Sequence, residues 1–178
     1  MSTKALLTVE QFGEMKTADT EDFELVEGDP VQLSSGTYRH NKIRDLLGHL
    51  LWAYFKSNPI SEAVGENDCV VANGIVHRPY LSIFPGERLR QIDPDKIPAP
   101  FAPDVAGELL SPSEAAVEVR RKALEYFRAG SKEVWILDHA NRELEIQTAA
   151  QSRFLGESDV LETSLLAGFS VKVADLLA

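Results

Sequence analysis

Apolar residues recur every three or four positions in one long stretch of the chain, residues 38–56. Leucine, isoleucine and aromatic side chains take these positions, and polar side chains fill most of the positions between them. Residues with this spacing share one face of a helix, so the stretch predicts an amphipathic helix. Asn58-Pro59 marks its end, because the residue before a proline avoids the helical conformation.

Shorter elements precede this helix. Thr8 and Gln11 have the spacing of a capping box, which predicts that a short helix begins there. Two strand-like runs, residues 23–26 and 31–34, flank the turn-forming sequence Glu27-Gly28-Asp29-Pro30. Together they predict an N-terminal β-hairpin.

After the long helix, the pattern predicts two longer strands, residues 62–72 and 75–84. Asn73-Gly74 lies between them, and Asn-Gly favours the two-residue turn of a β-hairpin. Residues 85–102 contain four prolines and few periodic apolar positions. We expect this segment to form a loop that crosses to the next strand, or a lid.

The second half of the chain alternates strands with one helix. The pattern first predicts a strand at 104–110 and a helix within 112–129 that ends at Gly130. It then predicts a buried strand at 134–137 and a more exposed strand at 142–148. The tail is predicted to contain one or two strands around 169–171 and a short final helix. The strand–helix–strand unit is typical of a parallel crossover. The predicted fold class is therefore α/β, a mixed β-sheet flanked by helices, with an N-terminal hairpin.

Length and composition favour a single globular domain over residues 1–178. The chain is 44% hydrophobic and 26% charged, as ordinary globular proteins are. No apolar run approaches the ~20 residues of a membrane span, and the N-terminal segment lacks the apolar core of a signal peptide. A single cysteine, Cys69, allows no internal disulfide and no cysteine zinc cluster. We therefore expect a cytoplasmic protein without membrane association.

Net charge modifies this picture in one place. The chain has 18 basic and 28 acidic residues, a net charge of −10, which argues mildly against tight binding of nucleic acid. A local basic strip lies on and after the predicted helix within 112–129. It consists of Arg120, Arg121, Lys122, Arg128 and Lys132. We interpret all of these except Lys122 as a solvated helix face paired with Glu118 and Glu125.

Glu108 is the first candidate for chemistry. It lies in an apolar strand, and a buried carboxylate needs a partner or a metal ion. Asp104 shares its strand face but lies about 13 Å away along the strand, too far for both to bind one ion directly. The residues alone leave two equal alternatives for Glu108, a metal ligand or a carboxylate paired with an arginine.

Lys122 lies at the border of the apolar stripe of its predicted helix. From there it can reach the rim of the sheet, or it can extend into solvent, as lysines more often do. Ser111-Pro112-Ser113-Glu114 has the spacing of a capping box, but a helix that begins there would carry Lys122 past Glu108. If Lys122 meets Glu108, the helix should begin nearer residues 114–118.

Glu24 and His40 are weaker candidates when judged from their own segments. Glu24 is equally well explained as an exposed hairpin residue, and His40 as a capping or surface residue at the start of the long helix. The chain contains no G-x-S-x-G, G-x-G-x-x-G, Walker A or His-x-x-x-His motif. Serine hydrolases, nucleotide-binding domains and zinc hydrolases therefore lose support.

Several segments together resemble the Uma-type restriction endonuclease family, a bacterial family with the PD-(D/E)XK nuclease fold. The resemblance runs from TVEQF and FELVEGDPVQLS to LLAGFSVKVADLL, and it is strongest in PDVAGELLSPS, VRRKALEYFRAG and VWILD. It implies catalytic roles for Glu24, for Glu108 as the strand glutamate and metal ligand, and for Lys122 as the lysine moved onto the following helix. His40 matches a recurrent histidine at a helix start and is an accessory candidate.

One position departs from the family pattern. The family places a metal-binding aspartate after Val-Pro, and here Tyr80 takes that place after Arg78-Pro79. Tyrosine is neutral near pH 7 and is a poor ligand for Mg²⁺. Glu108, together with Glu24, would then have to hold the ion, which should weaken the site severely. Tyr80 is thus an accessory candidate that marks a degenerate metal site.

The resemblance implies hydrolysis of phosphodiester bonds in nucleic acid, with DNA favoured, assisted by Mg²⁺ or Mn²⁺. Tyr80 leaves two hypotheses: a nuclease with a reduced site and weak metal binding, or an inactive homologue that binds nucleic acid or a protein partner. A small-molecule hydrolase and a pure interaction domain have no positive support. Nucleases of this fold commonly act as dimers, so we expect a homodimer.

Overall fold

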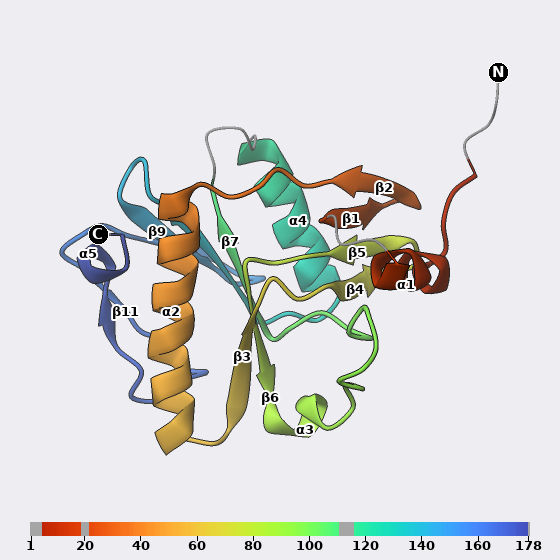
Figure 1. The fold of residues 1–178 in the computed structure, drawn as a ribbon. Coiled ribbons are helices and arrows are strands. Elements are labelled where there is room, and N and C mark those ends of the chain that lie inside the picture. The colour runs from red at the N-terminus through yellow and green to blue at the C-terminus, as the bar shows by residue number, and fades with distance from the viewer. Residues whose placement is uncertain (1–4, 19–21, 111–115, 178) are drawn as a thin grey trace.

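The computed structural model describes residues 5–18, 22–110 and 116–177. Its strands form a six-stranded sheet, a four-stranded sheet and a small two-stranded sheet. Helices α2 (Tyr38–Ser57) and α4 (Ala116–Arg128) pack on opposite faces of the six-stranded sheet (Figure 1). The structure confirms the predicted α/β class with helices flanking mixed β-structure.

The first two helices form as their local sequences predict. At the start of α1 (Val9–Ala18), the Thr8 N–H donates to Gln11 Oε1 at 2.9 Å and the Gln11 N–H donates to Thr8 Oγ1 at 3.2 Å. This is the reciprocal capping box. The Thr37 hydroxyl caps α2, whose apolar stripe is buried along its length. The buried residues of that stripe are Ile43, Leu47, Leu51 and Phe55.

The four-stranded sheet contains the N-terminal hairpin. Its order is β2-β1-β5-β4, with β1 (Phe23–Val26), β2 (Asp29–Gln32), β4 (Cys69–Ala72) and β5 (Ile75–His77). Glu27 and Gly28 alone make the first turn, both with positive φ (51° and 84°). Two such residues fit the twist of a hairpin, so β2 begins earlier than the predicted residue 31. The Asn73-Gly74 turn joins β4 to β5 as predicted.

The six-stranded sheet has the order β10-β9-β8-β7-β6-β3. Its strands are β3 (Ser61–Gly65), β6 (Leu81–Pro85), β7 (Val105–Leu109), β8 (Glu133–Asp138), β9 (Glu143–Gln147) and β10 (Ser152–Leu155). β7 and β8 pair in parallel on either side of α4 in the chain, which confirms the predicted crossover. The other neighbours pair antiparallel.

The two long strands predicted after α2 are wrong in one respect, because each is divided between the two sheets. β3 and β6 pair with each other in the six-stranded sheet, whereas β4 and β5 pair in the four-stranded sheet. The first break lies at residues 66–68, where Glu66 has a φ of 50°. The second lies at residues 78–80, where Pro79 has no N–H to donate to a ladder. The strands therefore build two main sheets instead of one.

The remaining elements are short. Helix α3 (Gly86–Leu89) interrupts the proline-rich crossing segment, and β11 (Val160–Leu161), β12 (Val171–Lys172) and α5 (Val173–Leu176) form the tail. β10 was not predicted as a separate strand. Gly130, with a φ of 98°, follows α4 as predicted. The capping-box sequence at residues 111–114 lies outside the described residues.

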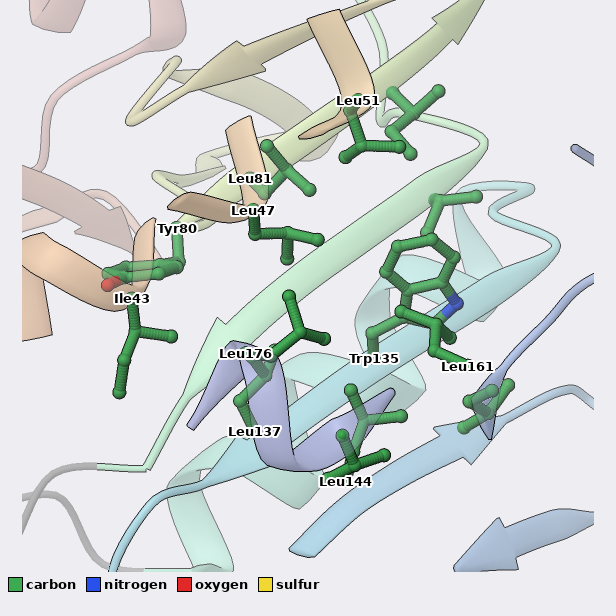
Figure 2. Packing of buried hydrophobic residues seen from close by; sticks show 14 of the residues in the cluster. Ile43, Leu47, Leu51, Tyr80, Leu81, Trp135, Leu137, Leu144, Leu161 and Leu176 are labelled. Carbon is green, nitrogen blue, oxygen red and sulfur yellow. The ribbon is translucent and has the colours of Figure 1, made fainter. Parts of the chain in front are cut away.

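Alternating residues of the central strands serve two hydrophobic clusters. One cluster joins α2 to residues such as Leu109 of β7 and Leu137 of β8 (Figure 2). The other joins α4 to Ala106 of β7 and Ile136 of β8. Glu108 alternates with Leu109 and therefore faces α4. Within the described ranges, no helix combines the length and the apolar character that crossing a membrane requires.

Candidate active site

A cleft of about 940 Å³ lies between the hairpin of the four-stranded sheet, the start of α2 and the carboxyl ends of β7 and β8. Side chains able to carry charge or protons are frequent in its lining. They are Asp22, Glu24, His40, Glu66, Arg78, Tyr80, Glu108, Glu118, Arg121, Lys122 and His139. All five residues singled out from the sequence (Glu24, His40, Tyr80, Glu108 and Lys122) therefore line one cleft.

Glu24, on β1, is a heavily engaged carboxylate of the cleft. It is 3% exposed, which excludes the interpretation as an exposed hairpin residue. Its Oε1 atom lies 3.0 Å from Lys122 Nζ and accepts a 2.8 Å hydrogen bond from the backbone N–H of Arg78. Burial raises the pKa of Glu24, but the polar contact with His77 and the charge of Lys122 outweigh burial and lower the pKa to about 2. Glu24 is thus a fixed anion.

Lys122, on α4, is buried and does not extend into solvent. Its ammonium group forms the ion pair with Glu24 across the gap between α4 and the hairpin. The described part of α4 runs from Ala116, and residues 111–115, which include the alternative predicted start, lie outside the described residues. Lys122 and Glu108 do line the same cleft, and Glu24 is one carboxylate that pairs with Lys122.

Glu108, on β7, is also buried. The hydroxyl of Tyr126, on α4, donates a 2.7 Å hydrogen bond to its Oε1 atom. Burial raises the pKa of Tyr126 far above its ordinary value, and the negative charge of Glu108 adds to this shift. Tyr126 therefore stays a neutral donor, and it fixes the orientation of the Glu108 carboxylate.

Tyr80 precedes β6, which pairs antiparallel with β7 so that Leu81 lies opposite Gly107. This register places the backbone of Tyr80 beside that of Glu108. The Tyr80 ring nevertheless packs in the hydrophobic cluster under α2 (Figure 2), where its hydroxyl accepts a 2.6 Å hydrogen bond from the Arg44 N–H. Burial raises the pKa of Tyr80, so its hydroxyl is neutral. Tyr80 therefore supplies no anionic oxygen at the position where the family resemblance implies an aspartate.

His77, at the end of β5, was not selected from the sequence. It is fully buried between two carboxylates, with Nε2 2.5 Å from Glu125 Oε2 and Nδ1 3.6 Å from Glu24 Oε2. Burial lowers the pKa of His77, but the hydrogen bond with Glu125 and the nearby carboxylate of Glu24 outweigh burial and raise the pKa overall. The available signal was a histidine inside the apolar strand run of β5, since a buried polar side chain needs partners.

His40 and His139 contribute imidazoles to the cleft. His40, in the first turn of α2, lies edge-on to the Tyr80 ring with 4.7 Å between ring centroids. Its backbone N–H, not its side chain, takes part in the Thr37 cap. His139 follows β8, and its Nδ1 atom is buried without a hydrogen-bond partner among the described residues. His40 lies at a helix start as predicted, whereas His139 was not selected from the sequence.

Two other sequence expectations concern charges near the site. Asp104 forms ion pairs with Arg88 and with Lys132, the latter at 2.5 Å, and it does not line the cleft. Arg121 pairs with Glu118 at 3.0 Å and with Glu125 at 2.6 Å, as the interpretation of a solvated helix face predicted. The basic strip is therefore compensated at Arg121 by acidic residues of its own helix.

The described side chains do not fit a tightly held divalent metal ion. Among them, no group of three or more histidine, cysteine, aspartate or glutamate residues is placed to hold one ion. Glu24 accepts from Lys122 and Arg78, and Glu108 accepts from Tyr126. Mg²⁺ favours several oxygen ligands around carboxylates that are available to it. The donor set therefore disagrees with the tight Mg²⁺ site of an intact nuclease.

Comparisons with known proteins agree with the fold. The model of the Uma2 family, described as "Putative restriction endonuclease", matches residues 9–174. A crystal structure of a putative nuclease belonging to DUF820 from Anabaena variabilis superposes with a TM-score of 0.82 at 20% sequence identity. The match covers 96% of this chain and 97% of that chain, and it shows a shared fold. A search of curated proteins found no match.

Proposed function

The chain belongs to the Uma2 family of restriction-endonuclease-like proteins, and from that premise we propose that it is a degenerate nuclease. In this proposal the cleft binds a phosphodiester of a nucleic acid beside Lys122. Metal-dependent cleavage is impaired because Tyr80 replaces an anionic ligand. The placement of the Tyr80 ring under α2 is the observation that carries the proposal.

The three residues that match the catalytic residues of the family pattern support the binding of a phosphodiester in this cleft. Glu24, Glu108 and Lys122 are all buried, yet they line one cleft. Burying three ionisable side chains together is costly, and folds tolerate the cost where the charges are paired or used. We infer that Glu108 is the principal oxygen ligand left for Mg²⁺ or Mn²⁺ and that any binding of these ions is weak.

The charge of the cleft limits its affinity for nucleic acid. Five carboxylates and three basic side chains are in its lining, and the basic ones already form ion pairs. Affinity for nucleic acid depends on basic groups that replace the counterions of phosphates. We therefore propose weak, salt-sensitive binding. DNA and a homodimeric state remain our expectations from the family resemblance.

A catalytically inactive homologue is the second candidate. The engagement of Glu24 by Lys122 and His77 favours it, because an anion already neutralised by internal cations has less to offer a metal ion. In that case the cleft serves only to bind nucleic acid or a protein partner. The two candidates differ in one observable, cleavage by the native chain when metal is supplied.

The test is a nuclease assay on labelled DNA and RNA with Mg²⁺ or Mn²⁺, using the native chain, Tyr80→Asp and Tyr80→Asn. Tyr80→Asn is the matched control, because it removes the same ring without adding a charge. We expect little metal-dependent cleavage by the native chain, and a gain of at least ~10-fold in Tyr80→Asp alone, since the added carboxylate supplies a hard ligand. Thermal denaturation of both variants checks that each is folded.

Three outcomes separate the candidates. Metal-dependent cleavage by the native chain that disappears in Glu108→Gln supports a reduced but working site. Cleavage that appears only in Tyr80→Asp supports the inactive homologue. Efficient cleavage by the native chain that requires added metal, is absent in EDTA and survives Glu108→Gln would refute the proposed site.

A further inference from the structure

Two histidines line the cleft beside Glu24, Glu108 and Lys122, and neither has a role in the proposed metal-dependent cleavage. His40 comes from the start of α2, and His139 comes from the segment that follows β8. The chain has two other histidines. His77 is fixed between Glu24 and Glu125, and His49 is exposed on α2 beside Trp52, with ring centroids 6.2 Å apart. Only His40 and His139 combine access to the cleft with imidazoles outside the buried ion pairs.

His40 is held in one orientation by its surroundings. Its ring stands edge-on to Tyr80 at 4.7 Å, and the Tyr80 ring is itself fixed by the hydrophobic cluster and by the Arg44 N–H. A ring supported in this way is a better proton acceptor than a mobile surface histidine, because its position relative to a bound substrate is set in advance. Tyr80, at the sequence position where the family pattern has a metal ligand, therefore supports the His40 imidazole.

The surroundings of His40 favour its neutral form. Burial lowers the pKa of His40; the charge of Glu66 opposes this, and the charges of His139 and Arg44 reinforce it. A lowered pKa favours the neutral imidazole, which is the form that accepts a proton. His40 is therefore suited to act as a base in the cleft.

His139 contributes a second imidazole to the lining of the cleft. Its Nδ1 atom is buried and has no hydrogen-bond partner among the described residues. A buried polar atom without a partner is costly in a folded protein. No hydrogen bond among the described residues therefore commits this atom to a structural role.

We propose that this cleft catalyses metal-independent transesterification of single-stranded RNA, with His40 as the general base and His139 as the general acid. His40 takes the proton of a ribose 2′-hydroxyl, and the 2′-oxygen forms a bond to the adjacent phosphorus. The bond from phosphorus to the 5′-oxygen breaks, and His139 gives its proton to that oxygen. The products are a 2′,3′-cyclic phosphate and a 5′-hydroxyl, and exchange with water restores both histidines.

This chemistry suits the groups that are present. It uses the nucleophile of the substrate itself, so it needs no metal-bound water. Lys122 lies in the same lining and supplies positive charge near the phosphate. DNA lacks the 2′-hydroxyl and cannot react in this way. The inference rests on the proposed function only in placing a nucleic-acid phosphodiester in the cleft.

The test uses a short fluorescent single-stranded RNA in excess EDTA, with the full chain and three variants. His40→Ala and His139→Ala should each lower the cleavage rate by ~10²–10⁴-fold, the usual contribution of one general acid or base. His49→Ala is the matched control and should cleave at the native rate. The 3′ ends should carry a 2′,3′-cyclic phosphate, and an RNA with a single 2′-deoxyribose should be spared at that position.

The results that overturn the inference are distinct. They are no cleavage of RNA in EDTA by the native chain, native rates in both His40→Ala and His139→Ala, or equal cleavage of DNA. His40→Gln, which keeps a polar side chain of similar size, replaces His40→Ala if thermal denaturation shows that the alanine variant is unfolded. Cleavage that requires Mg²⁺ bears instead on the metal-dependent proposal, so failures of the two are distinguishable.

Discussion

The ion pair between Lys122 and Glu24 should stabilise the fold far more than a surface pair does. Glu24 is 3% exposed, and Lys122 reaches it from another part of the chain. Lys122→Met keeps the length of the side chain and removes its charge, which leaves the buried carboxylate without its ammonium partner. Removing one partner of a buried pair costs ~3–5 kcal/mol. That is a large share of the ~5–15 kcal/mol by which domains are usually stable.

The pKa of Glu24 gives an independent measure of the same effect. Burial raises this pKa, and His77 and Lys122 together lower it from 4.5 to about 2. A fall of that size corresponds to roughly 3 kcal/mol of stabilisation. Because the folded-state pKa lies below the unfolded-state value, the stabilisation is complete above about pH 4.5 and is lost as the pH falls toward 2. Lys122→Met should therefore lose stability at pH 7 and depend less on pH in this acid range.

The measurement is a double-mutant cycle by urea unfolding at pH 7, with Lys122→Met, Glu24→Gln and the double variant. We expect a coupling free energy of at least ~2 kcal/mol, because each single variant leaves a buried charge that the double variant removes. The exposed pair Lys96–Asp93, at 3.2 Å, is the matched control and should couple far less. A Lys122–Glu24 coupling as small as that of the control would refute the reasoning.

Two further predictions concern the buried ionisable groups around this pair. His77→Gln should destabilise the protein by about 3 kcal/mol, because Glu24 and Glu125 each lose one of the partners that they contact in the buried site. Tm should fall by ~6–12 °C, and a fall no larger than that of His49→Gln would contradict this. Burial raises the pKa of Asp68 from 3.8 to about 6, and the charge of Arg78 opposes it, so ionisation costs stability as the pH rises through this range. At pH 8, Asp68→Asn should therefore be more stable than the native chain by up to ~3 kcal/mol. At pH 3.5, thermal melts should show no gain in stability. An equal effect on stability at both pH values would show that Asp68 ionisation is not the cause.

Local sequence signals predicted the local structure well. The capping box at Thr8, the apolar stripe of α2 and the Asn73-Gly74 turn depend on residues a few positions apart, and the structure contains all three. The division of residues 61–85 between two sheets was not predictable in the same way. β3 pairs with β6, and β4 pairs with β5. The alternation of apolar and polar residues along a strand does not indicate which sheet the strand joins.

The candidate site shows the same limit for side chains. Glu24 matched the family pattern, but from its own segment it was equally an exposed hairpin residue. In the fold it is buried and paired with Lys122, which lies 98 positions further along the chain. His77 and His139 were missed because their roles depend on elements that meet only in the fold. A histidine within a strand shows that it needs a partner and does not show which partner it has.

Tyr80 connects the two proposals, because it has opposite effects on them. Its ring supports His40, and its neutral hydroxyl leaves the metal site without an anion. Tyr80→Phe keeps the ring, so metal-independent cleavage of RNA should persist. Tyr80→Asp removes the ring and adds a carboxylate, so metal-dependent cleavage should appear while the EDTA-resistant activity falls. Tyr80→Asn should lose the EDTA-resistant activity and gain nothing. If the two activities rise and fall together across these three variants, they do not depend on Tyr80 in opposite ways, and at least one of the two proposed roles is wrong.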